Sequence, residues 1–177
     1  MSISRESRVR LVRHQADLAA TYGEFPVVEQ TWEVSRSAYQ CERERFDERS
    51  LGGAGVWLAN ERGEILLVRE EGDDAWADPG GKRESGESFE MAAQREVREE
   101  TGVDCRLTGL RDFHEIEYRP PDGSPPMYEA IVIFDGEHAG GEPRSRSGEI
   151  ADVGWFAEPP ERVVYEEVRT RPYPASE

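Results

Sequence analysis

The chain has 177 residues, of which 38 are acidic and 22 are basic, so its formal net charge is −16 at pH 7. This length corresponds to one domain with an extension, and so negative a field repels long nucleic acids and anionic membranes. No apolar run is long enough to cross a bilayer, and the amino terminus lacks the apolar core of a secretory signal. These features predict a soluble, cytoplasmic protein.

The basic residues are strongly skewed, because Lys82 is the single lysine and all the others are arginines. One interpretation is adaptation to strong salt, where a Debye length of about 3 Å screens a dense acidic surface. The other is a codon bias that favours arginine. Salt adaptation predicts a melting temperature that rises with molar KCl, whereas a codon bias predicts one that does not change.

The first 50 residues are predicted to form an amino-terminal extension. Apolar residues recur at helical spacing over residues 7 to 22, and Tyr22-Gly23 closes that segment. β-forming residues around Val28 and Trp32 indicate a strand within 25 to 35, and residues 37 to 49 carry a weak helical pattern. We assign residues 1–50 to this extension and residues 51–177 to one main domain.

The main domain shows alternating strand and helix patterns. The expected elements are two strands within 53–70 with a turn at 61–64, a helix at 88–101, strands within 103–118, at 127–135 and at 152–157, and a helix at 161–168. Pro159 and Pro160 suit the first turn of that closing helix, and Gly102 suits a left-handed cap of the earlier one. Hairpins mixed with helices favour an α/β fold with a mixed sheet between helices.

Three carboxylates share one face of the helix at 88–101. Glu96, Glu99 and Glu100 stand at i, i+3 and i+4, and this arc continues the apolar face formed by Phe89, Ala92, Ala93 and Val97. Like charges on an inward face need a compensating cation, and an oxygen-only set suits Mg²⁺ or Mn²⁺. Upstream, Pro79-Gly80-Gly81 predicts a turn whose backbone can approach an ion or a phosphate.

A longer motif joins these features. Every fixed position of the pattern Gx5Ex7REUxEExGU, with U a bulky aliphatic residue, is filled by Gly81, Glu87, Arg95, Glu96, Val97, Glu99, Glu100, Gly102 and Val103. This segment resembles the Nudix box of the Nudix hydrolase superfamily. The resemblance implies an α/β/α sandwich around a mixed sheet, and hydrolysis of a nucleoside diphosphate linked to another group with Mg²⁺ or Mn²⁺.

The resemblance also implies residue roles. Glu96, Glu99 and Glu100 would be metal ligands, with the carbonyl of Gly80 as an extra one, and Glu87 would lie nearby through water or by pairing with Arg95. The general base would be Glu96 or Glu149, which lies in a loop before the last strand. Other candidates stay weaker: Lys82 for a phosphate, and Trp57, Trp76, Tyr118 and Tyr128 for stacking on a base.

The substrate is left open by the sequence. ADP-ribose or a nucleotide sugar is the first choice, and a (deoxy)nucleoside triphosphate is the second; Tyr118, Pro120 and Pro121 all fall where family members carry substrate-specific residues. Two hypotheses from different classes are a non-catalytic nucleotide sensor of the same fold and an acidic interaction protein. The extension could form a homodimer contact or a lid over the nucleotide.

Overall fold

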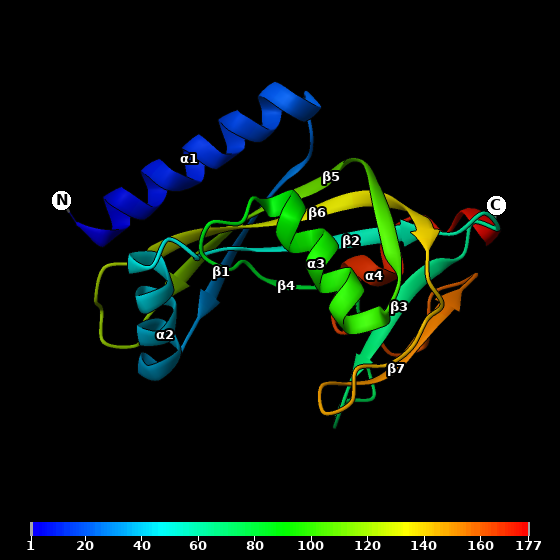
Figure 1. Cartoon of the computed structure of the whole chain (residues 1–177). Helices are drawn as coiled ribbons and strands as arrows, with labels where there is room; N and C mark the ends of the chain where they lie inside the picture. Colours follow the sequence, from blue (N-terminus) through cyan, green and yellow to red (C-terminus); the bar gives the residue numbers. More distant parts are fainter. Residues whose placement is uncertain (1, 177) are drawn as a thin grey trace.

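A computed structural model describes residues 2–176, which fold around one seven-stranded mixed sheet (Figure 1). The helices are α1 (Ile3–Tyr22), α2 (Arg36–Asp47), α3 (Phe89–Thr101) and α4 (Glu166–Thr170), with a 3₁₀ turn at Pro174–Ser176. The strands are β1 (Val27–Glu33), β2 (Gly53–Ala59), β3 (Ile65–Glu70), β4 (Gly80–Lys82), β5 (Asp104–Arg119), β6 (Met127–Gly140) and β7 (Ile150–Phe156).

The strand order is β1-β5-β6-β2-β3-β7, and β4 pairs with β2 beside this path. β1 runs parallel to β5 and β2 runs parallel to β6, while the other pairs are antiparallel. β1 comes from the amino-terminal extension, so the extension supplies an edge strand of the main sheet.

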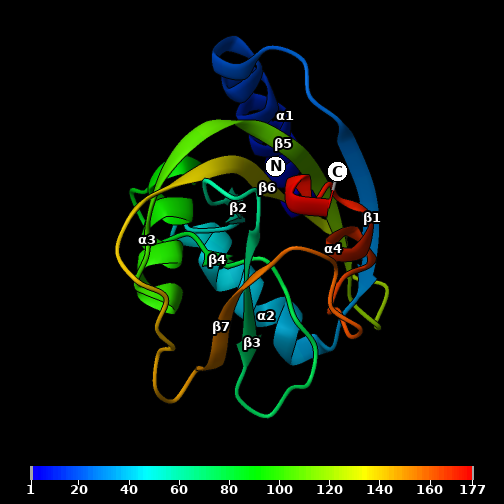
Figure 2. The same cartoon turned by 90° about the vertical axis from the view of Figure 1, so that its right-hand side faces the viewer.

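Helices cover both faces of the sheet, as Figure 2 shows for α3 and α4 on opposite sides of the central strands. Alternation along β2 decides which side chain meets which layer. Val56 and Leu58 pack in one cluster with α1 and α3, whereas Trp57 packs on the other face with Val168 and Tyr173. The predicted α/β/α sandwich around a mixed sheet is confirmed.

Helix α3 begins and ends where the sequence predicts. The Ser88 side chain accepts a hydrogen bond from the Met91 N–H at 3.1 Å, and Gly102 has the left-handed conformation, with φ of 73°. Both ends of α3 are therefore fixed by local chemistry, which sets its carboxylates in a defined register against the sheet.

Four expectations about element bounds were wrong. Residues 80–82 form strand β4 instead of a turn, because Gly80 and Gly81 pair with Gly55 and Ala54. The helix predicted at 7–22 begins at Ile3, where Ser2 caps it. The strand predicted at 127–135 continues to Gly140, because β6 stays paired with β5 over that length.

The fourth wrong expectation concerns the helix predicted at 161–168, which starts later in the structure. The backbone N–H of Trp76 donates to the Arg162 carbonyl, and the backbone N–H of Val164 donates to the Trp76 carbonyl. These bonds form an isolated parallel bridge between Trp76 and Val163. Helix α4 therefore begins at Glu166, well after Pro159 and Pro160. Within residues 2–176, no helix combines the length and the apolar character needed to span a membrane.

Candidate active site

The carboxylates of α3 differ in burial. Glu100 is 6% exposed, Glu96 is partly buried, and Glu99 is exposed. The apolar side chains of the same face are buried as predicted, namely Phe89, Ala92, Ala93 and Val97. Glu96 and Glu100 thus lie where α3 meets the sheet, while Glu99 lies at its solvent edge.

The two glycines of β4 allow this close approach. A Cβ atom on Gly81 would lie 2.6 Å from the Glu96 carboxyl carbon, and one on Gly80 would lie 2.6 Å from the Ala54 carbonyl oxygen. The Gly80 N–H donates to Glu100 Oε2 at 3.1 Å. Side chains at these positions would push β4 away from both β2 and α3.

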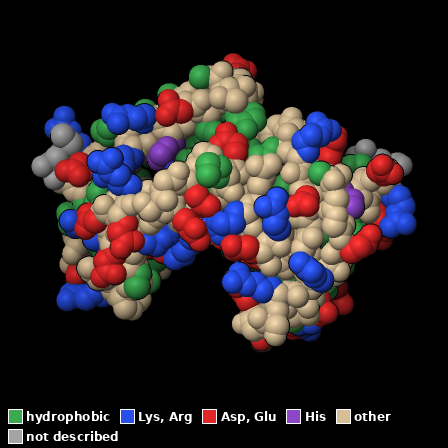
Figure 3. Space-filling model, viewed as in Figure 1, with side chains coloured by type: hydrophobic (Ala, Val, Ile, Leu, Met, Phe, Trp, Pro, Cys, Tyr) green, Lys and Arg blue, Asp and Glu red, His purple; other side chains and the backbone are tan. Residues whose placement is uncertain are grey.

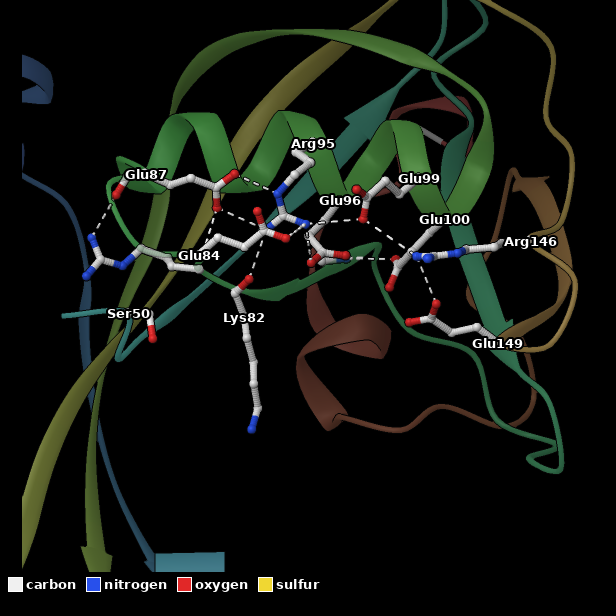
Figure 4. Close-up of polar contacts among 12 residues, drawn as sticks. Ser50, Lys82, Glu84, Glu87, Arg95, Glu96, Glu99, Glu100, Arg146 and Glu149 are labelled. Atoms are coloured by element: carbon white, nitrogen blue, oxygen red, sulfur yellow. Dashed lines mark hydrogen bonds and ion pairs between the residues drawn. The ribbon is translucent and has the colours of Figure 1, made fainter. Parts of the chain in front are cut away.

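Arg95 connects the acidic groups (Figure 4). Its guanidinium donates to both Glu87 oxygens, at 2.6 and 3.0 Å, and to Glu96 Oε1 at 2.8 Å. It also donates to Glu99 at 3.2 Å and to the Lys82 carbonyl at 3.0 Å. The hydrogen bonds with Glu87 raise the pKa of Arg95 and lower that of Glu87. Of the two arrangements expected for Glu87, the structure shows the direct pairing with Arg95.

Glu100 has no arginine partner in the described structure, and its surroundings favour a proton. Burial raises its pKa to about 8, and the nearby carboxylates Glu96, Glu149 and Glu70 act in the same direction, against the Gly80 N–H. Burial also raises the pKa of Glu96, although Arg95 opposes that shift. The site therefore has negative charge that the chain itself does not fully compensate.

Glu149 lies in the loop before β7 and faces the end of α3. Its carboxylate pairs with Arg146 Nη1 at 2.9 Å, and the same nitrogen lies 3.5 Å from Glu99 Oε2. Figure 4 shows Arg146 between Glu99 and Glu149. Arg146 was not singled out from the sequence, since nothing local marks a loop arginine as the partner of a distant helix.

The donor set fits a hard divalent cation. The atoms that could bind an ion at the contact of α3 with β4 are carboxylate and carbonyl oxygens, and burial raises the pKa of both Glu96 and Glu100. As they stand, Glu96 and Glu99 bind Arg95, and no three His, Cys, Asp or Glu side chains of residues 2–176 converge as a metal-binding group. Binding an ion through Glu99 therefore requires that side chain to leave Arg95 and Arg146.

A cavity of about 400 Å³, here called the acidic cavity, opens beside these carboxylates. Gly80, Gly81 and Glu100 line its edge, and Ile131 and Ile133 of β6 form part of its apolar wall. Deeper inside, Tyr118 donates to Glu129 Oε1 at 2.5 Å, and the Gly52 N–H donates to Glu129 Oε2 at 3.1 Å. Burial raises the pKa of Glu129 to about 7.

The sequence profile of the NUDIX domain matches residues 50–173. The chain belongs to this family. It is 34% identical over 96 residues to the 8-oxo-dGTP diphosphatase of Escherichia coli (strain K12), covering 52% of this chain and 70% of that protein. It is 35% identical over 108 residues to the NAD-capped RNA hydrolase NudC of Stutzerimonas stutzeri (strain A1501), covering 60% of this chain and 36% of that protein.

A solved MutT NUDIX hydrolase from Burkholderia pseudomallei has a related fold, with a TM-score of 0.51 and 25% identity. The match covers 64% of this chain and 89% of that one. Two Bacillus subtilis relatives, at 33% and 31% identity, are matched over less than two thirds of their length. Members of the Nudix family generally use divalent metal ions.

The four aromatic candidates of this Nudix domain lie in different places. Tyr118 lines the acidic cavity, and Trp76 packs edge-to-face on Phe156 beside it. Trp57 is buried against Tyr173, and its indole N–H donates to the Pro172 carbonyl at 3.0 Å. Tyr128 lies under the Arg8 guanidinium at α1.

Trp32 and Tyr165, which the sequence did not indicate as stacking residues, also line the acidic cavity.

Lys82 points away from the α3 carboxylates (Figure 4). Its ammonium group pairs with Glu42 Oε1 of α2 at 2.5 Å, and Arg45 pairs with Glu42 Oε2 at 2.7 Å. The lysine thus ties α2 of the extension to β4.

The far wall of the acidic cavity holds buried charges that the sequence did not reveal. Arg171 pairs with Asp78 at 3.4 Å and with Asp112 at 3.1 Å. His114 is 7% exposed, burial lowers its pKa, and its Nε2 atom has no hydrogen-bond partner among the described residues. These side chains come from β5 and two loops, so only the tertiary structure brings them together.

Proposed function

We propose that this Nudix domain hydrolyses a phosphoanhydride bond in a nucleoside diphosphate linked to another group, with Mg²⁺ or Mn²⁺. The observation that carries this proposal is the position of Glu100 at the edge of a partly apolar cavity of about 400 Å³, with Glu96 close to Glu100 on the same helix. The cavity can take a nucleoside while the diphosphate lies along the carboxylates. In a chain of net charge −16, a phosphate group binds there only with cations.

We assign different roles to the side chains of the Nudix box. Glu96, Glu99, Glu100 and the carbonyl of Gly80 would hold the metal, which neutralises phosphoryl oxygens and activates water when bound. Arg95 fixes Glu96 and Glu87 against the α3 surface through its fork of N–H groups. Glu96 or Glu149 accepts the proton of the attacking water, since both lie beside Glu100.

The substrate is proposed on the chemistry of the cavity. Trp32 and Tyr165 offer rings for a base, and Gln30 and Glu167 offer polar groups at the opposite wall. ADP-ribose or a nucleotide sugar is the first choice, and the NAD-capped RNA hydrolase among the relatives is named for a cap in which two nucleosides share a diphosphate. A (deoxy)nucleoside triphosphate is the second candidate, supported by the 8-oxo-dGTP diphosphatase.

A substrate panel assayed with Mg²⁺ and Mn²⁺, at low salt and in molar KCl, tests this proposal. ADP-ribose should give AMP and ribose 5-phosphate, while a triphosphate should give a monophosphate and pyrophosphate. Removal of the metal should abolish turnover. Nucleotide binding without turnover would instead identify a sensor, and absence of both binding and turnover with every nucleotide would refute the proposal.

Two further predictions concern the whole protein. A homodimer formed through the extension would appear as a doubled mass in light scattering. A cytoplasmic location follows only from composition and is tested by cell fractionation.

A further inference from the structure

A second cavity of about 290 Å³ lies between α1, α2 and the sheet, and we call it the arginine cavity. Four guanidinium groups line it, from Arg10, Arg13, Arg49 and Arg83, together with the His14 ring. Figure 3 shows basic side chains along α1 and beside α2 on this side of the molecule. Such a concentration of positive charge is unexpected in a chain of net charge −16.

Carboxylates compensate these four arginines only in part, because burial lowers the pKa of Arg83 while nearby Glu87 and Glu129 oppose that shift. Arg10 donates to the Phe46 carbonyl at 2.7 Å, and Arg83 donates to the carbonyls of Leu51 and Glu87. Within residues 2–176, none of the four forms an ion pair, although most other arginines of the chain do. Glu129 also borders the cavity, but Tyr118 and Gly52 already bind its carboxylate.

The cavity holds two of its arginines in preset positions. The Arg10 guanidinium stacks 3.8 Å above the Phe46 ring, and the Arg83 guanidinium stacks 4.4 Å from the centre of the Phe89 ring. Rings and carbonyls fix these cations without removing their charge. Preorganised arginines of this kind suit the oxygens of a phosphate group, which they can bind in pairs of hydrogen bonds.

The backbone conformation of Arg49 is a second observation, independent of the charge of the cavity. It follows the end of α2 with a φ of 60°, and it is the one non-glycine residue with positive φ in the described chain. Glycine usually occupies this position after a helix, because a Cβ atom is crowded by the backbone in the left-handed conformation. The chain thus tolerates backbone strain where it places an arginine beside the cavity.

We propose that the arginine cavity binds a compact phosphate anion with at least two negative charges, such as pyrophosphate or the phosphate of a nucleoside monophosphate. This site is separate from the α3 carboxylates and does not depend on the proposed hydrolase activity. The side chains of Arg10, Arg13, Arg49 and Arg83 provide the positive charge.

Calorimetry on protein freed of metal by a chelating resin tests this site. Without metal the acidic cavity repels phosphates, and a soluble chelator is avoided because it is itself a polyanion. Pyrophosphate should bind, and the double variant Arg13→Gln/Arg49→Gly should bind at least about tenfold more weakly, since two charged contacts are lost. Arg5→Gln, an exposed arginine of α1 outside the cavity, should bind as the wild type does.

The histidines show by NMR where the anion binds. Burial lowers the pKa of His14 to about 4, with Arg83, Arg10 and Arg13 in the same direction and Asp17 opposed. An anion in the arginine cavity should raise the pKa of His14 and shift its ring signals. His114 in the acidic cavity and His138 beside Trp155 should not shift.

Each result decides the proposal. No binding of pyrophosphate or AMP at millimolar concentration, equal affinity in the double variant, or an unshifted His14 would overturn it. If the site exists, the two ligands identify the source of the phosphate. Tighter binding of AMP indicates a nucleotide, and tighter binding of pyrophosphate indicates an inorganic anion.

Discussion

The acidic cavity and the arginine cavity are separated by one strand yet have opposite electrostatics. Ile131 and Ile133 of β6 face the acidic cavity, Tyr128 and Ala130 face the arginine cavity, and Glu129 borders both. On one side burial and neighbouring carboxylates raise the pKa of Glu100, and on the other side four guanidinium groups line the cavity without an ion-pair partner among the described residues. Local placement of a few side chains, not the net charge of −16, therefore decides what each cavity can bind.

Glu100→Gln tests the acidic cavity most severely. The amide oxygen can still accept the Gly80 N–H, so the fold should persist, but one proposed metal ligand is lost. Turnover should fall about 10³-fold, equivalent to about 4 kcal/mol of transition-state stabilisation. Steady-state kinetics and calorimetric melting measure the two effects. Glu90→Gln, on the same helix and bound to Tyr22, is the control, and a Glu100→Gln enzyme with most of the wild-type rate would refute the assignment.

Arg95→Lys keeps the positive charge beside the α3 carboxylates but removes the forked guanidinium that binds Glu87 and Glu96. A lysine cannot make the paired hydrogen bonds to Glu87 while also reaching Glu96, so turnover should fall roughly 10- to 100-fold and the melting temperature should drop. Arg98→Lys, whose partner Asp104 is exposed, should change neither quantity. Similar behaviour of the two variants would show that Arg95 acts only as a surface charge.

Glu129→Gln tests the wall between the cavities through the pH dependence of stability. Burial raises the pKa of Glu129 in the folded state to about 7, so its favourable contribution is complete below the unfolded pKa of about 4.3 and is lost as pH rises through 7. Between pH 5 and 8 the wild type should lose about 2 kcal/mol more unfolding free energy than the variant. Urea unfolding measures this difference, with exposed Glu137→Gln as the control. Parallel pH profiles would contradict the assignment.

Arg146→Gln should have the smallest effect. It frees Glu99 and Glu149 from an exposed ion pair, so the Mg²⁺ concentration for half-maximal activity should fall roughly threefold. Arg144→Gln, in the same loop, should leave that concentration unchanged. A higher Mg²⁺ requirement in Arg146→Gln would mean that this arginine helps to bind substrate.

Sequence reasoning was most accurate where local chemistry decides the structure. Ser88 and Gly102 fixed both ends of α3, and helical spacing placed its apolar face against the sheet. It failed where pairing partners are distant: β4 has no side-chain pattern, and the bridge from Trp76 to Val163 delays α4. The cavity walls were equally hidden, because Arg171, Asp78 and Asp112 come from three segments. The metal and catalytic roles of Glu96, Glu99, Glu100, Gly80 and Glu149 stay predictions.

β1 makes the extension inseparable from the rest. It pairs with β5 from Val27–Phe113 to Glu33–Arg119, and its Gln30 and Trp32 line the acidic cavity. A fragment cut at residue 51, close to where the family profile begins, would leave the edge of β5 from Phe113 to Arg119 without its partner strand, so the backbone N–H and C=O groups of every second residue there would be unpaired. An exposed edge strand of this kind pairs with strands of other molecules, so we expect such fragments to aggregate before their activity can be measured.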